Sequence, residues 1–349
     1  MKVFKKGLAG ILTYVLARKL GFEQGPYLVT FIPTLRCNAR CRACDIWKMG
    51  HDGDEMTLSE IRAVFDQMSD LRVVKITGGE PFLRKDLSDI IDYLLNERGL
   101  MVQITTNGLL TDRILDTVGR TANPRLHLNV SLDGVGEFVN TMRGIPDYFD
   151  TVLGTLKKLV EIRKEKKFFL AVNQTMFFGD KTQWPTLKPV LKKIGITNIH
   201  YGIENNLFDS EASETDKKNY WRTISRDDFL KLREVVERYH LTSFIRDIAY
   251  KYYFKGLENR VLNKLEKPKF KCTALNTYFR LFPNGDVLTC SVIAKPVTNV
   301  RNEDFNAVWK SPEMERARKT VSNCEGCWFG CEAIPNATVN LDILEAIFY

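Results

Sequence analysis

The sequence lacks three features that would place it quickly in a class of proteins. The apolar run at residues 8–17 is about half of the roughly 20 residues that a membrane-spanning helix needs, and Arg18 and Lys19 end it. The four histidines stand alone, without the spacing of a metal site. Lysines and arginines are not clustered with interleaved aromatic residues, as they are in nucleic-acid-binding proteins. We therefore expect neither a membrane span nor a nucleic-acid partner.

Cysteine is absent from the long stretch between residues 45 and 271. All eight cysteines lie in two groups, at 37–44 and 272–331. Disulfide frameworks serve small secreted domains, whereas clustered cysteines in a cytosolic chain are typical of metal or cluster ligands. The distribution therefore predicts two metal or cluster sites in a cytoplasmic protein.

Composition sets wide bounds on the class of partner. With 349 residues and 44% hydrophobic content, the chain can form one large domain and a smaller one. Its net charge of +8, from 51 basic and 43 acidic residues, is a mild excess. Such an excess permits an anionic substrate, a membrane surface or an acidic redox partner, but selects none of them.

Short β-branched runs alternate with amphipathic stretches from residue 27 onward. Such alternation predicts right-handed βαβ units and a parallel sheet, with ligands at the carboxyl ends of its strands. The strands are expected at 27–34, 73–77, 101–106, 126–131, 168–175 and 198–203. The helices are expected at 57–68, 87–97, 111–120, 148–163 and 185–194.

The rest of the chain falls outside this alternation. Residues 209–220 are polar and aperiodic and are expected to form a loop, followed by helical stretches at 225–240 and 243–265. Asn284-Gly285 between apolar runs predicts a β-hairpin from 278–282 to 287–289. Residues 2–20 read as a basic-flanked helix that either packs on the body or lies at a membrane interface.

The first cysteine group forms a Cys-x3-Cys-x2-Cys run of Cys37, Cys41 and Cys44. Three thiolates on a short loop can bind a [4Fe-4S] cluster and leave one iron open, which can chelate an amine and a carboxylate. A zinc site that borrows a fourth ligand is the alternative, but structural zinc sites normally show paired cysteines or histidines.

Together with these cysteines, further motifs make the chain similar to the radical S-adenosylmethionine (SAM) superfamily. The second predicted strand ends in a GGEP motif, which in this family contacts the methionyl amino group of SAM. The third and fourth strands end in TNG and SLDG, and an Arg-Gly pair follows. The resemblance implies SAM contacts by Gly78, Gly79, Glu80, Pro81, Asn107, Ser131, Asp133 and Arg143.

The resemblance implies a partial (β/α)6 TIM-like barrel and a radical mechanism. One electron from an external reductant of the flavodoxin or ferredoxin type cleaves SAM to a 5′-deoxyadenosyl radical, which abstracts a hydrogen atom from the substrate. Many relatives carry an aromatic residue where this chain has Ala43, so we expect adenine to be packed by other residues. Trp47 is a candidate for that contact or for a core or lid position.

The second cysteine group resembles the SPASM and twitch extensions of that superfamily. Cys272, Gly285 and Cys290 match the signature Cys-x9–15-Gly-x4-Cys, and Cys324, Cys327 and Cys331 follow. Seven cysteines serve two clusters in a complete SPASM domain, so five imply one auxiliary [4Fe-4S] cluster, with zinc as the alternative. The fifth thiol is either inert or a hydrogen-atom donor of an epimerase. Without such a donor, the auxiliary cluster is expected to accept the second electron in an oxidation or cross-linking reaction.

The sequence leaves the substrate open. Only 36 residues precede Cys37, too few for the peptide-recognition domain of many SPASM enzymes, so we expect a small metabolite, an amino sugar or a lipid-linked molecule. Residues 2–20 are the candidate for contact with a membrane surface. A peptide presented by a separate protein is the alternative, and a non-enzymatic iron–sulfur or zinc protein is the rival of another class. His200 and Glu204, near the end of the sixth predicted strand, are the best placed of the remaining residues for a general base. The Phe177-Phe178 pair reads as core, and His51, His127 and His240 read as structural or surface residues. The expected division is 1–24 (N-terminal helix), 25–208 (barrel), 209–265 (connection) and 266–349 (auxiliary domain).

Overall fold

A computed structural model describes residues 2–22, 24–49, 54–205, 211–237, 244–265, 271–324, 327–342 and 344. The predicted strands and helices of the barrel lie within these ranges. His51 and His240, whose roles were considered from the sequence, lie outside the described residues.

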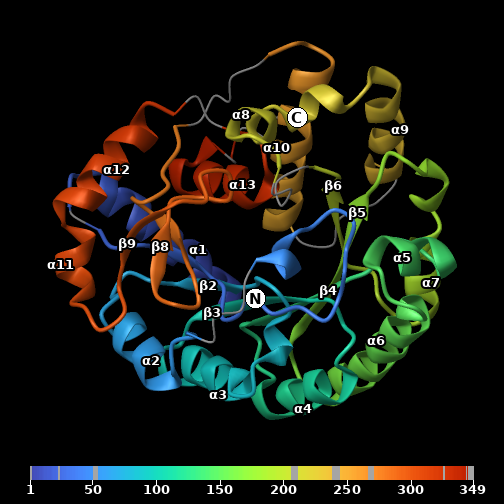
Figure 1. The fold of residues 1–349 in the computed structure, drawn as a ribbon, viewed down its shortest axis with the longest axis horizontal. Coiled ribbons are helices and arrows are strands. Elements are labelled where there is room, and N and C mark those ends of the chain that lie inside the picture. The colour runs from blue at the N-terminus through green and yellow to red at the C-terminus, as the bar shows by residue number, and fades with distance from the viewer. Residues whose placement is uncertain are drawn as a thin grey trace.

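The fold is built on one sheet of nine strands that is not closed into a barrel (Figure 1). The strand order is β6-β5-β4-β3-β2-β1-β7-β8-β9, and neighbours from β6 to β7 are parallel. The first six strands are β1 (Leu28–Phe31), β2 (Val73–Ile76), β3 (Met101–Thr106), β4 (Leu126–Ser131), β5 (Phe169–Met176) and β6 (Ile199–Ile203). The six-stranded parallel sheet expected from the sequence is therefore present.

Alternating side chains give this sheet two different faces. Val29 and Phe31 of β1, like Val74 and Ile76 of β2, are buried in the main hydrophobic core. The residue between each pair, Thr30 or Lys75, is only half-buried and points to the opposite, inner face. The sheet therefore has an apolar outer face covered by helices and a polar inner face.

An outer arc of helices covers the apolar face (Figure 1). A capping box of Thr57 and Glu60 starts the first of these helices, at the position where the sequence predicted a helix. The short helix α5 before Gly144 was not predicted. The helices are α2 (Leu58–Asp66), α3 (Leu87–Asp92) with a π-helical extension at Tyr93–Glu97, α4 (Thr111–Thr121), α5 (Gly136–Arg143), α6 (Tyr148–Glu165) and α7 (Leu187–Lys193).

The predicted hairpin continues the main sheet. Strands β7 (Tyr278–Leu281) and β8 (Asp286–Leu288) are antiparallel and meet at the expected Asn284-Gly285 turn. The sequence did not predict that β7 also pairs with β1 in parallel, with Arg280 opposite Thr30. Strand β9 (Pro296–Asn299) completes the edge. The C-terminal region is therefore joined to the barrel through a shared sheet.

The prediction of a loop throughout 209–220 was wrong in part. Glu214–Lys218 form the short helix α8, which starts at a capping box in which Ser213 and Asp216 bond reciprocally. Hydrogen bonds of this box stabilise a helix without an apolar stripe, so the periodicity gave no signal. The helices α9 (Arg226–Glu237) and α10 (Phe244–Val261) follow near their predicted positions.

Three helices after β9 were also absent from the sequence prediction. They are α11 (Phe305–Trp309), α12 (Pro312–Ser322) and α13 (Gly330–Asn340). Helix α13 packs against α10 and carries Cys331 in its first turn (Figure 1).

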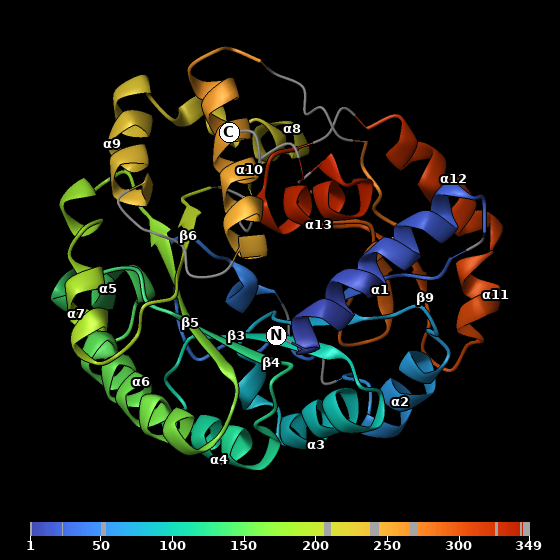
Figure 2. The ribbon, with the colours of Figure 1, turned by 180° about the vertical axis from the view of Figure 1, so that it is seen from behind.

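Helix α1 (Lys2–Lys19) lies across the back of the molecule beside α13 (Figure 2). The hydroxyl of Tyr14 donates a 2.8 Å hydrogen bond to the carbonyl of Gly25, and its ring lies 5.0 Å from that of Tyr27. Leu12 and Leu16 on the same helix are exposed. The packed alternative for residues 2–20 is thus seen for one face of α1. No helix among the described residues is long and apolar enough to cross a membrane.

Candidate active site

Cys37, Cys41 and Cys44 lie on the loop between β1 and α2, at the carboxyl end of β1. All three thiols are free and half-buried. Burial raises the pKa of Cys37, and raises that of Cys44 to about 11, while backbone N–H groups of Ala39 and Ile46 oppose the shift by donating to the two sulfurs. The charge of Cys41 also raises the pKa of Cys37, and the charges of Cys41 and Cys37 raise that of Cys44, because the three sulfurs lie close together.

These features fit a cationic cluster. A bound metal replaces the thiol protons, and the N–H donors stabilise the resulting thiolates. Among the described residues, no three His, Cys, Asp or Glu side chains are arranged to hold a single metal ion. The detailed ligand geometry at both cysteine groups stays a prediction.

The backbone of the cysteine loop is held from two sides. On one side, the N–H groups of Arg40 and Arg42 donate to the carbonyls of Arg143 and Met142, at 3.0 and 2.9 Å. On the other side, the N–H groups of the GGEP segment donate back to the start of the loop, from Gly79 to Thr34 and from Glu80 to Arg36. The loop is therefore positioned by the ends of β2 and α5.

The two glycines of GGEP are required by this close approach. A Cβ atom on Gly79 would lie 2.0 Å from the carbonyl oxygen of Arg36. A Cβ on Gly78, whose φ is +127°, would lie 2.6 Å from a methyl group of Ile32. The glycines thus make room for the backbone of the cysteine loop. Their expected contact with SAM is a separate prediction.

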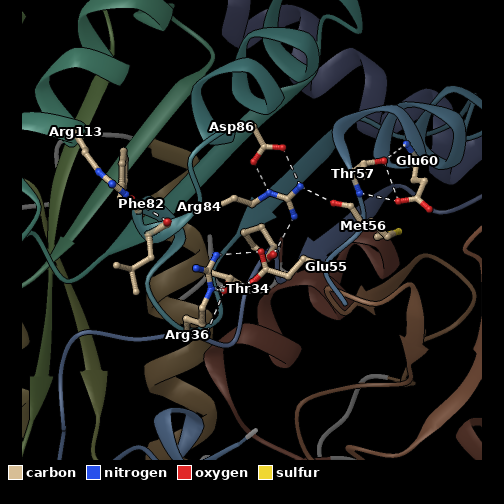
Figure 3. A network of polar contacts seen from close by, with 12 residues as sticks. Thr34, Arg36, Glu55, Met56, Thr57, Glu60, Phe82, Arg84, Asp86 and Arg113 are labelled. Atoms are coloured by element: carbon tan, nitrogen blue, oxygen red, sulfur yellow. Dashed lines mark hydrogen bonds and ion pairs between the residues drawn. The ribbon is translucent and has the colours of Figure 1, made fainter. Parts of the chain in front are cut away.

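A buried arginine after the GGEP motif joins the two ends of the cysteine loop (Figure 3). The Arg84 guanidinium donates to the carbonyl of Pro33 before the loop, at 3.1 Å, and to that of Met56 after it. Asp86 fixes the same guanidinium through an ion pair of 2.7 Å. Pro81 starts the 3-10 turn Pro81–Leu83 that leads to Arg84. This sequence region therefore acts as a clamp on the loop.

Glu80 is buried and links β2 to β3. Its carboxylate accepts hydrogen bonds from the Thr106 hydroxyl at 2.8 Å, the Asn107 N–H at 2.7 Å and the Phe82 N–H at 3.1 Å. Burial raises the pKa of this carboxyl to about 7, although the three donors oppose the shift. The Asn107 side chain in turn donates to Asn38 between Cys37 and Cys41, at 2.7 Å. Glu80 therefore positions Asn107 against the cysteine loop.

Asp133 and Arg143 form a buried pair next to Cys41. The guanidinium donates to the Asp133 carboxylate at 2.7 and 2.5 Å, and lies 3.7 Å from the sulfur of Cys41. The second oxygen of Asp133 accepts the Thr175 N–H at the end of β5. Burial opposes the charge of Arg143, but Asp133 raises its pKa well above the usual value. Arg143 thus brings a fixed positive charge to the cysteine loop.

The β4 end adds Ser131, whose carbonyl lies 2.7 Å from the Tyr148 hydroxyl. The same hydroxyl lies 2.8 Å from the carbonyl of Asn107. The structure therefore brings together the ends of β2, β3, β4 and α5, which carry the predicted SAM contacts. Arg84, Asn38 and Tyr148 also shape this site but were missed, because none belongs to a spacing motif.

A cavity of about 1180 Å³ opens beside Cys44. Its wall includes Ala43 with the aromatic side chains of Phe138 and Phe177, whose rings lie 6.3 Å apart. Glu204 also lines it and accepts the Phe178 N–H at 2.8 Å. Phe177 and Phe178, which were expected in the core, thus line this cavity together with Glu204. Trp47 is not part of its lining.

The five C-terminal cysteines gather around α13. The sulfur of Cys290 accepts the Ile293 N–H at 3.3 Å, and the Ser291 hydroxyl lies 3.6 Å from that of Cys331. Burial raises the pKa of Cys290 and of Cys272. Burial also raises the pKa of Cys327, and the charges of Cys290 and Cys331 add to that shift. These free thiols fit a second cluster site in the same way as the first group.

Comparison with known proteins agrees with this geometry. The profile of the radical SAM superfamily matches residues 31–182, and that of the SPASM iron–sulfur cluster-binding domain matches residues 272–331. The probable GTP 3′,8-cyclase of Methanocaldococcus jannaschii is 32% identical over 265 residues, which cover 74% of this chain and 82% of the relative. The AdoMet-dependent heme synthase of Methanosarcina barkeri is 23% identical over 326 residues, or 90% of each chain.

Solved structures show the same fold. Streptococcus suis SuiB bound to S-adenosylmethionine has a TM-score of 0.62 at 18% identity, covering 86% of this chain and 70% of SuiB. Native anSMEcpe with bound AdoMet and a peptide has a TM-score of 0.58 at 16% identity, covering 93% and 97%. A catalytic [4Fe-4S] cluster with SAM and auxiliary iron–sulfur binding follow from the two matched domains. The chain belongs to the radical SAM superfamily and carries a C-terminal SPASM domain.

Proposed function

We propose that this enzyme abstracts a hydrogen atom from a small-molecule substrate bound beside SAM in the cavity next to Cys44. The observation that carries the proposal is the volume of that cavity, about 1180 Å³. Ligand pockets for one drug-sized molecule span roughly 300–1,000 Å³, so the space suits SAM together with a small organic molecule. The heme synthase and GTP cyclase among the relatives support a small-molecule substrate.

The residues around the cavity have distinct proposed roles. Cys37, Cys41 and Cys44 hold the catalytic cluster, which supplies the electron that generates the 5′-deoxyadenosyl radical. Phe138 and Phe177 provide aromatic surface near Ala43, where adenine lacks its usual partner. The other contacts with SAM are those predicted for the strand ends from Gly78 to Arg143.

The C-terminal cysteines are proposed to hold one auxiliary [4Fe-4S] cluster for electron transfer or substrate binding. Cys331 is the best candidate for the thiol that is not a ligand, because it is exposed whereas the other four are half-buried. A Cys331→Ala variant should then keep its full iron content, whereas Cys290→Ala should lose the auxiliary iron. Loss of iron from both variants would make Cys331 a ligand.

The natural reductant is proposed to be a flavodoxin or ferredoxin, for which the mild positive charge of the chain is suitable.

A peptide substrate is the second candidate, supported by the structure of SuiB bound to its precursor peptide. That structure shares only the fold with this chain, at 17% identity, so the small-molecule proposal is preferred.

Anaerobic reconstitution tests the proposed function. We expect about eight irons per chain and formation of 5′-deoxyadenosine from SAM after dithionite reduction. A variant with Cys37, Cys41 and Cys44 replaced by Ala should retain about four irons and form no nucleoside. An iron-loaded wild-type protein that forms no 5′-deoxyadenosine would reject the proposal.

A further inference from the structure

Three neighbouring strands place two cations on the inner face of the sheet. The register sets Lys75 of β2 and Arg280 of β7 on either side of Thr30 of β1. Adjacent strands are about 4.8 Å apart, so the two Cα atoms are separated by about 10 Å. Two long side chains on the same face can reach one ligand group across that distance.

The two cations have different local partners. The Arg280 guanidinium bonds to the Ser291 hydroxyl and lies 3.7 Å from the Glu332 carboxylate. Glu332 is fixed in turn by the N–H and hydroxyl of Ser291, at 2.9 and 2.6 Å. Lys75, by contrast, makes no hydrogen bond or ion pair with any residue that the structure describes. The charge of Lys75 on this face is therefore not neutralised by an ion pair with a described residue.

Lys75 lies inside the molecule. Burial is the largest cause that lowers the pKa of its ammonium, and Cys331 and Glu332 in the first turn of α13 oppose the shift. The residue is nevertheless only half-buried by accessible surface. Part of the Lys75 side chain therefore stays accessible to a small ligand.

A second polar group on the same face lacks a partner. Asn129 of β4 is 1% exposed, and neither its side-chain oxygen nor its nitrogen has a hydrogen-bond partner in the part of the chain that the structure describes. It belongs to the inner face, because Leu128 and Val130 on either side are buried in the core. Buried amides are nearly always hydrogen-bonded, so Asn129 is a further point where a ligand would bind.

We propose that the inner face of β7, β1 and β2 binds an anionic group of the substrate, a carboxylate or a phosphate, between Lys75 and Arg280. The proposal rests on the proposed function and specifies its substrate as an anion. Arg280, held by Ser291 and Glu332, supplies a rigid fork, and Lys75 supplies the unpaired charge. Asn129 then binds a neutral polar group of the same molecule farther along the sheet.

Calorimetric titration of the reconstituted wild-type protein with inorganic phosphate, and separately with succinate, tests this site. We expect saturable binding of at least one probe, and the tighter one identifies the anion class. Lys75→Met should weaken its binding at least tenfold, whereas Lys75→Arg should retain it within about threefold because the charge is kept. Lys157→Met, which removes the same charge from an exposed position on α6, should leave binding unchanged.

The proposal is overturned if wild-type protein binds neither probe, or if Lys75→Met binds as tightly as wild type. Iron content and circular dichroism of each variant establish that the protein is folded and loaded. Anion binding is measured without reductant or turnover. Absence of 5′-deoxyadenosine formation in wild type would therefore reject the proposed function without changing the outcome of this titration.

Discussion

At the scale of single residues, the cysteine loop depends on groups that are small or fully buried. Gly79 lets the loop backbone pass where any Cβ would overlap the carbonyl of Arg36. Glu80 accepts three hydrogen bonds, two from the end of β3 and one from the turn after β2, and Arg84 holds both ends of the loop. Each of these groups acts on the position of the cysteines without carrying iron.

Gly79→Ala should destabilise the site strongly, because the Cβ would meet backbone that cannot rotate away. Overpacking of this kind costs about 1–3 kcal/mol, and we expect the variant to lose the catalytic iron while it keeps the auxiliary iron. Iron analysis and urea unfolding measure both effects. The matched control is Gly119→Ala in α4, where a Cβ has nothing within 4 Å and should be neutral or stabilising. Full iron loading of Gly79→Ala would contradict this role.

Glu80→Gln should change how stability depends on pH. The pKa of Glu80 is raised from 4.5 to about 7 in the fold, so the folded state holds a proton that the unfolded state releases. The stabilisation from that proton is complete below pH 4.5 and is lost as pH rises towards 7. Gln does not titrate, so the variant does not lose this stabilisation. Its free energy of unfolding, relative to that of wild type, should therefore increase by about 3 kcal/mol as pH rises from 4.5 to 7.

Urea unfolding of both proteins without SAM, at several pH values, measures this difference. A constant difference between the two proteins would show that Glu80 has an ordinary pKa. With SAM present, the pH effect should shrink if the ammonium group of SAM faces the carboxylate, because a nearby cation lowers its pKa.

At the scale of elements, α10 positions the loop that carries Cys327. The Trp328 ring lies against the backbone of α10 at Gly256, and its N–H donates to the carbonyl of Tyr253 at 2.8 Å. The Arg260 guanidinium covers the ring at 4.1 Å. The Tyr220 hydroxyl, from the wall of the cavity beside Cys44, donates to the Trp328 carbonyl at 2.8 Å. One tryptophan thus connects the two cluster regions.

Gly256→Ala should displace Trp328, because the new Cβ would lie 1.7 Å from a ring atom. We expect loss of the auxiliary iron with retention of the catalytic iron, the reverse of the Gly79→Ala result. Iron content and tryptophan fluorescence of the reconstituted variant measure the change. Gly154→Ala in α6, with nothing within 4 Å of its Cβ, serves as the control. Unchanged iron and fluorescence would show that the ring is free to move.

The sequence predicted the positions of helices and strands better than it predicted which strands pair. Strands β1 to β6 were found because short β-branched runs alternate with amphipathic helical stretches, and the hairpin because Asn284-Gly285 favours one turn type. Period-two alternation identifies a strand's faces but not its neighbour, so the pairing of β7 with β1 was missed. Helix α8 was missed because hydrogen bonds rather than an apolar stripe define it.

The candidate site was predictable to a similar extent. Cysteine spacing and the motifs at the strand ends located the catalytic region, since those ends meet at one edge of a parallel sheet. The clamp of Arg84 depends on carbonyl groups of Pro33 and Met56, which have no sequence signature. The placement of Lys75 near Arg280 likewise depends on how β7 pairs with β1. That pairing register cannot be read from the sequence.

At the scale of the whole molecule, the barrel and the SPASM domain share one sheet. The backbone groups of β1 pair on one side with β2 and on the other with β7. Arg301, beyond β9, adds an ion pair of 2.8 Å to Glu60 of α2. The predicted boundary near residue 266 therefore does not coincide with a break in the hydrogen-bonded sheet.

A chain truncated after residue 265 should fail to fold into a stable monomer. Removal of β7 would leave the edge of β1 unpaired next to the hydrophobic core, and open edges promote aggregation. Soluble yield and light scattering, compared with full-length protein, measure this effect. A soluble, monomeric truncation with cooperative unfolding would show that residues 1–265 form an independent domain.

The pairing of β1 with β7 also fixes an order of events during synthesis. Strand β1 leaves the ribosome early, whereas its second neighbour is made only after the barrel strands and α10 are complete. Contacts between such distant segments form late in folding. The nascent chain therefore carries an open strand edge through most of translation, together with the first three cysteines. Chaperone binding and iron delivery during that interval would act on an unfinished sheet rather than on the native enzyme.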